Sequence, residues 1–133
     1  MERTVQVKNV TKSYKNNTKV LDGVNYDFEK GKFYAIMGRS GAGKSTLLNI
    51  IGTIDDATEG DVCIEGENIS GLKEKEKAQL RMKKIGFIFQ GFYLNPYLNA
   101  LENVITPMRI NPEIPAKERR NLALNLLDSF GVK

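Results

Sequence analysis

Hydrophobic and polar residues alternate in two segments near the N-terminus of the chain. The alternation covers residues 5–8 and residues 24–29, and a shorter copy covers residues 62–64. A period of two is typical of strands that are buried on one face. We therefore expect three half-buried strands in the first half of the chain.

Two other segments are apolar at nearly every position. They are residues 33–37, Phe-Tyr-Ala-Ile-Met, and residues 85–89, Ile-Gly-Phe-Ile-Phe. A strand that is covered on both faces of its sheet has this composition. Both segments are predicted to be buried strands with a neighbouring strand on either side.

Helical patterns occupy most of the remaining chain. The predicted helices cover residues 44–51, 73–84, 99–107 and 122–130, the second of them highly charged and exposed. Gly52 is a suitable residue to end the first helix. Strands and helices follow one another along the chain, so the predicted fold class is α/β.

The amino-acid composition excludes several kinds of catalytic and metal site. The 133 residues include no histidine and one cysteine, which excludes histidine-dependent nucleophiles, intrachain disulfides and metal sites made of this chain's thiolates. No apolar run approaches the roughly 18 residues that a membrane span requires, and the N-terminus lacks a secretory signal, so a cytoplasmic location is expected. The net charge of +4 comes from basic residues interleaved with acidic ones, which favours a mixed-charge surface and no nucleic-acid partner.

A glycine-rich motif follows the first apolar segment. It matches G-x-x-x-x-G-K-S/T and is followed by Thr46; its residues are Gly38, Arg39, Ser40, Gly41, Ala42, Gly43, Lys44 and Ser45. Such a loop between a strand and a helix points its backbone amides at phosphate oxygens. Lys44 would bind the β- and γ-phosphates, Ser45 would ligate Mg²⁺, and Thr46 would bind the α-phosphate. The motif predicts nucleotide binding.

Further motifs resemble those of ABC transporter ATPases. They are Thr-Lys-Ser-Tyr at residues 11–14, Ile-Phe-Gln at 88–90, Tyr-Leu-Asn-Pro at 93–96 and Leu-Glu-Asn-Val at 101–104. Within that family the chain is most similar to the branch for lipoprotein release, macrolide export and antimicrobial-peptide resistance. The resemblance covers residues 1–133 and implies a P-loop NTPase core with an N-terminal antiparallel β subdomain.

The resemblance also implies roles for individual residues. Tyr14 would stack on adenine with Val20 beside the same base, and Gln90 would contact Mg²⁺ and the attacking water. ATP and Mg²⁺ are thus the implied ligands. The implied partners are a second ABC ATPase and a membrane-spanning subunit that contacts residues 90–108, which would place the chain at the inner face of the cell membrane.

The family's signature motif, Walker B aspartate, catalytic glutamate and switch histidine do not occur in the chain. We therefore expect it to be the N-terminal part of one nucleotide-binding domain, able to bind ATP but unable to hydrolyse it alone. Two alternatives remain open at this point. One is a truncated cassette that acts as an interaction or regulatory protein, and the other is a small P-loop kinase.

Three residues outside these motifs are assigned no catalytic or binding role. Cys63 is predicted to be a small buried apolar side chain. Asp55 and Asp56 lie in the variable loop that follows the first predicted helix.

Overall fold

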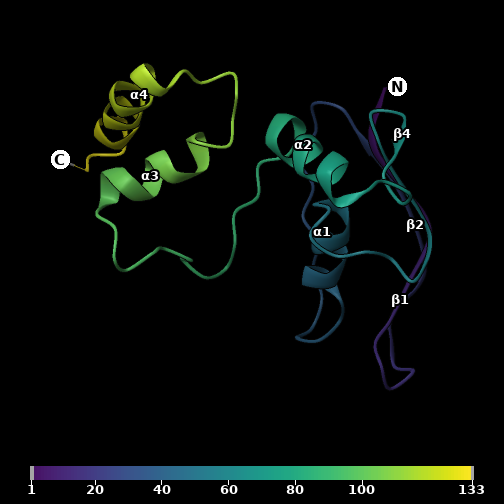
Figure 1. The fold of residues 1–133 in the computed structure, drawn as a ribbon. Coiled ribbons are helices and arrows are strands. Elements are labelled where there is room, and N and C mark those ends of the chain that lie inside the picture. The colour runs from purple at the N-terminus through teal and green to yellow at the C-terminus, as the bar shows by residue number, and fades with distance from the viewer. Residues whose placement is uncertain (1, 133) are drawn as a thin grey trace. The chain divides into compact units, whose positions relative to one another are not determined.

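The computed structural model describes residues 2–132. The chain forms two compact units whose boundary lies between Phe87 and Ile88 (Figure 1).

The first unit is built on a four-stranded antiparallel sheet in the order β2-β1-β3-β4. The strands are β1 (Arg3–Ser13), β2 (Lys19–Glu29), β3 (Glu59–Ile64) and β4 (Glu67–Asn68). In β1, Val7 pairs with Tyr26 on one side and with Val62 on the other. The predicted N-terminal antiparallel β subdomain is confirmed.

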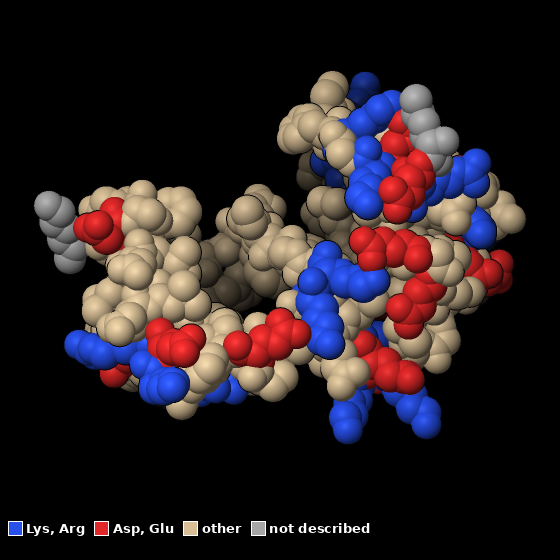
Figure 2. All heavy atoms as spheres, turned by 90° about the horizontal axis from the view of Figure 1, so that it is seen from above, with Lys and Arg blue, Asp and Glu red and all other residues tan. Residues whose placement is uncertain are grey.

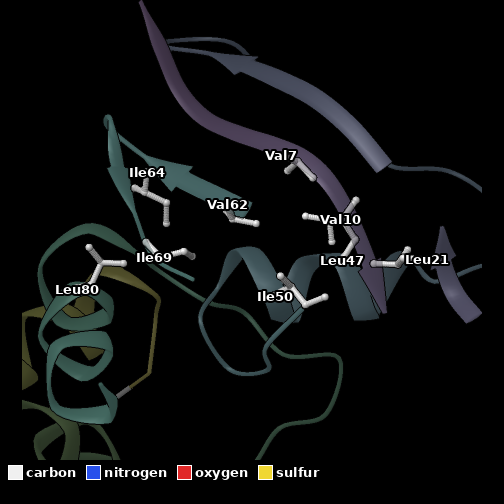
Figure 3. Packing of buried hydrophobic residues seen from close by; sticks show 9 residues of the cluster. All are labelled: Val7, Val10, Leu21, Leu47, Ile50, Val62, Ile64, Ile69 and Leu80. Carbon is white, nitrogen blue, oxygen red and sulfur yellow. The ribbon is translucent and has the colours of Figure 1, made fainter. Parts of the chain in front are cut away.

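Helices α1 (Lys44–Ile51) and α2 (Glu74–Lys84) complete the core of the first unit. Figure 3 shows that side chains from the strands and both helices meet in one apolar cluster; its members are Val7, Val10, Leu21, Leu47, Ile50, Val62, Ile64, Ile69 and Leu80. Cys63 is buried as predicted. The helix that follows the glycine-rich motif is thus anchored to the sheet by Leu47 and Ile50.

The prediction of buried strands at residues 33–37 and 85–89 is wrong. Neither segment pairs with a strand of the part of the chain that the structure describes. Phe33 is 94% exposed, Met37 88% and Ile88 97%. Apolar composition indicates what a segment would bury, but a strand also needs a neighbouring backbone to bond with.

Only alternate residues attach the segment 33–37 to the sheet. The Tyr34 ring packs edge-on against Phe28, with ring centres 5.0 Å apart, and the Tyr34 hydroxyl accepts a hydrogen bond from the Glu29 amide at 2.9 Å. Tyr34 and Ile36 are half-buried, while the residues between them are exposed. One side of the segment is therefore covered and the other is not.

The second unit contains α3 (Ala100–Met108) and α4 (Ala116–Ser129), which pack on each other. Asn99 and Glu102 form the predicted capping box at the start of α3. Ala123 of α4 is buried, but Leu126 is 41% exposed and Phe130, which follows the helix, is 82% exposed. The predicted apolar stripe of this helix is thus only partly covered.

Charged residues of both signs are interspersed on the face shown in Figure 2. Within residues 2–132 no helix is long and apolar enough to cross a membrane.

The exposed apolar segments predict self-association. Replacing Phe33 and Ile88 with lysine should shift the chain toward monomer in sedimentation velocity without lowering its free energy of unfolding, because both side chains are already exposed. The core variant Ile50→Ala should instead lower that free energy by about 2–5 kcal/mol. A wild-type chain that stays monomeric at all concentrations would contradict this account.

Candidate functional site

The glycine-rich motif forms a loop that leads directly into α1. Within it the Ala42 amide donates a hydrogen bond to the Arg39 carbonyl at 3.1 Å. Gly41 has a φ of 78° and Gly43 a φ of 96°, a region that residues with a Cβ rarely adopt. The loop conformation therefore requires glycine at these two positions.

Gly43 also lies against the start of β2. A Cβ atom at this position would lie 2.8 Å from Cδ2 of Leu21 and 2.9 Å from the Val20 carbonyl oxygen. The packing places Val20 beside the loop, and its predicted contact with adenine stays a prediction. The β1–β2 hairpin and the glycine-rich loop are thus in direct contact.

Lys44 folds back over the loop that precedes it. Its Nζ donates hydrogen bonds to the Gly38 carbonyl at 2.5 Å and to the Arg39 carbonyl at 2.7 Å. The two carbonyls therefore hold the positive charge at the loop. An ammonium group held there can bind an anion that the loop encloses.

The start of α1 is suited to an anion. Among the described residues no side chain caps this end of the helix, and its first turn contains no acidic residue. The first amides of a helix have no partner within it, and they carry the positive end of the helix dipole. Ser45 is exposed on this turn and Thr46 is half-buried, while Arg39, Ser40 and Ala42 are exposed on the loop.

Tyr14 lies at the end of the β1–β2 hairpin. Its amide donates to the Thr18 carbonyl at 3.3 Å, its carbonyl accepts from the Asn17 amide at 2.9 Å, and the residue is 50% exposed. The Lys12 ammonium lies 5.2 Å from the centre of the Tyr14 ring. A ring with this exposure has surface available for another planar group.

Asp55 and Asp56 are held by two lysines from different elements. Lys12 Nζ is 2.8 Å from Asp55 Oδ1, and the buried Lys77 Nζ is 2.5 Å from Asp56 Oδ1. The hydrogen bond with Asp56 raises the pKa of Lys77 above 10.5, against the opposing effect of burial. These contacts give both carboxylates a structural role that their sequence alone did not indicate.

Gln90 lies in the second unit, where its side chain is exposed. Its predicted contacts with Mg²⁺ and water stay predictions. The following loop exposes four large side chains, as expected: Phe92 (93%), Tyr93 (80%), Leu94 (66%) and Tyr97 (93%).

The sequence alone does not indicate the contacts that surround Tyr14. Lys12 belongs to the Thr-Lys-Ser-Tyr motif without an assigned role, and its partner Asp55 is 43 residues away in the chain. The signal in the sequence is the spacing of two between Lys12 in β1 and Tyr14, the residue that follows this strand. In extended backbone that spacing places two side chains on one face.

Comparison with known proteins agrees with this geometry. The family model for the ABC transporter matches residues 21–133. The chain belongs to the ABC transporter family. It is 43% identical to the lipoprotein-releasing system ATP-binding protein LolD of Aquifex aeolicus over 98% of its own length and 56% of that protein. The bacitracin export ATP-binding protein BceA of Halalkalibacterium halodurans is 45% identical over 85% of this chain and 46% of that protein.

Solved structures agree with the fold as well as the family. The ATP-binding cassette MJ0796 in a dimeric post-hydrolysis state, bound to ADP and Pi, matches with a TM-score of 0.84 and 45% identity over 93% of this chain and 56% of that one. MJ0796 comes from Methanocaldococcus jannaschii. The chain thus has the fold of an ABC ATPase cassette and spans a little more than half of the length of several relatives that it matches.

The Lys12–Asp55 pair predicts a pH-dependent contribution to stability. Burial acts to raise the pKa of Asp55, but hydrogen bonds from Lys12, the Asp56 amide and Tyr14 outweigh it and lower that pKa below 3.8. At pH 7 the variant Asp55→Asn should therefore be less stable by at most about 1 kcal/mol, since the carboxylate is partly exposed.

This difference should persist above the ordinary pKa of 3.8 and disappear as the pH falls through the lower folded-state value, because the carboxylate is then protonated in both states. Denaturant unfolding at pH values from 7 to 2 measures it. A difference that grows as the pH falls would contradict the assignment.

Proposed function

We propose that the chain is the ATP-binding part of an ABC transporter and binds Mg-ATP through residues 38–46. The observation that carries this proposal is the position of Lys44, whose Nζ bonds to the carbonyls of Gly38 and Arg39 beside the uncapped first turn of α1. Cation, loop amides and helix dipole all favour the same ligand, a polyphosphate.

Each residue of the site has a distinct part in this proposal. The amides of the loop and of α1 bind phosphate oxygens, and Lys44 neutralises the β- and γ-phosphates. The Ser45 hydroxyl is exposed at the first turn and would ligate the Mg²⁺ that accompanies ATP. Tyr14 and Val20 would bind adenine, and Gln90 would contact Mg²⁺ and water.

The reaction served by this site would be ATP hydrolysis in the complete transporter. Support comes from MJ0796, a relative captured as a dimer in a post-hydrolysis state with ADP and Pi. We infer that this chain likewise pairs with a second ABC ATPase. LolD and BceA belong to a releasing system and an export system, which supports export as the direction of transport.

A membrane-spanning subunit is the second proposed partner, bound through residues 90–108 at the inner face of the membrane. Asn103 stabilises the loop in this region. Its side-chain Nδ2 donates hydrogen bonds of 3.0–3.2 Å to the backbone carbonyls of Asn95, Leu98 and Asn99. Exposed aromatic residues on an ordered loop are common at protein interfaces. Tyr97 and Phe92 would be the main contacts.

Replacing Lys44 with alanine should lower the affinity for Mg-ATP at least tenfold. The reason is the loss of a charge-assisted contact, typically about 1.5–3 kcal/mol. Isothermal titration calorimetry gives the affinity, and Lys75→Ala, an exposed lysine on α2, is the matched control. Equal affinities for wild type and Lys44→Ala would refute the proposed site.

The double variant Phe92→Ser/Tyr97→Ser should reduce binding to the membrane-spanning subunit more than tenfold. Aromatic residues buried at an interface often contribute roughly 2 kcal/mol or more to the binding free energy. Its affinity for Mg-ATP should not change. Co-purification with the co-expressed subunit in detergent measures the first quantity, with Lys117→Ser on α4 as the control. Undiminished co-purification of the double variant would show that the interface lies elsewhere.

A further inference from the structure

The Lys12 side chain links Tyr14 to the segment that follows α1. Only 12% of this side chain is exposed, and its Nζ donates to Asp55 Oδ1 at 2.8 Å and to the Asp56 carbonyl at 2.6 Å. The same ammonium lies 5.2 Å from the centre of the Tyr14 ring, within the range of a cation–π contact. One cation thus joins two acceptors and an aromatic ring.

The segment after α1, which binds Lys12 through Asp55 and Asp56, is itself hydrogen-bonded to β1. The Thr58 amide donates to the Thr11 carbonyl at 2.8 Å, and the Ser13 amide donates to the Thr58 hydroxyl at 3.0 Å. These bonds limit movement of Asp55 and Asp56 relative to the end of the strand. The Lys12 ammonium near the Tyr14 ring is therefore held in place both by its own strand and by the segment after α1.

The Tyr14 ring is held by the same cluster. Tyr14 follows the last residue of β1 and is half-exposed, and its hydroxyl hydrogen-bonds to Asp55, the carboxylate that also binds Lys12. Without Lys12 and Asp55 the ring would sample several rotamers at the end of the hairpin. A cation in contact with a ring restricts its orientation and leaves the rest of the ring surface accessible. Fixing the ring before the base arrives lowers the conformational entropy that binding would cost.

We propose that Lys12 is a positioning residue for the nucleotide base: anchored by Asp55 and the Asp56 carbonyl, it holds the Tyr14 ring in the orientation that stacks on a purine. The inference rests on the proposed function, since it concerns how the same nucleotide is bound. It assigns Lys12 and Asp55 to base recognition and leaves phosphate binding to the loop at residues 38–46.

The test compares ATP with inorganic tripolyphosphate, which has the phosphates but no base. Calorimetry on the full chain, with Mg²⁺, gives the ratio of the two affinities for the wild type, Lys12→Met, Asp55→Asn and Tyr14→Ala. Lys12→Met keeps the length of the side chain and removes its charge, and Lys75→Met on α2 is the matched control.

Tyr14→Ala should lower the affinity for ATP about fivefold or more, the equivalent of a lost base stack, and leave that for tripolyphosphate unchanged. Lys12→Met and Asp55→Asn should each lower the affinity for ATP about two- to fivefold and leave the affinity for tripolyphosphate unchanged. Lys12→Arg, which keeps the cation, should restore most of the preference for ATP. In the Tyr14→Ala background, Lys12→Met should cause no further loss.

A merely structural role for Lys12 predicts a different result. Lys12→Met would then lower the melting temperature and weaken both ligands equally, or weaken neither, and either outcome overturns the inference. A wild-type chain that binds ATP no more tightly than tripolyphosphate overturns it too, while phosphate binding stands. A wild-type chain that binds neither ligand overturns the proposed function itself.

Discussion

The glycine-rich loop depends on the space between Gly43 and the start of β2. No side chain fits there, because a Cβ atom would come within 2.8 Å of Leu21 and 2.9 Å of the Val20 carbonyl oxygen. With Gly43 in this position and a φ of 96°, the chain turns sharply into α1. The turn places the uncapped amides of that helix and the Lys44 ammonium beside the same loop. Replacing Gly43 would therefore affect the loop and the helix together.

The β1–β2 hairpin supports both halves of the proposed nucleotide site. Its second strand supports the glycine-rich loop through Val20 and Leu21, and its turn carries Tyr14. Leu47 and Ile50 anchor α1 to the sheet, while Lys12 and Lys77 hold the segment after that helix. A site built on elements that are fixed to one core requires little reorganisation when the ligand binds.

The sequence predicts those features that depend on residues close together in the chain. A phosphate loop is determined by glycines, a lysine and a helix within a few residues, and the capping box at Asn99 is determined by a residue three positions away. It was misleading at residues 33–37, because an apolar run does not reveal whether strands are present beside it. It was silent on the contact between Lys12 and Asp55, which joins residues 43 positions apart through folding alone.

Backbone amide NMR during a titration with Mg-ATP would show whether the glycine-rich loop binds the nucleotide. The amides of the loop and the first turn of α1 are the proposed ligands of the phosphates, so their signals report on the site residue by residue. We expect the largest shifts at Gly41, Gly43, Lys44, Ser45 and Thr46, all following a single saturation curve. Unchanged signals at these residues while the protein is saturated with Mg-ATP would show that the nucleotide binds elsewhere.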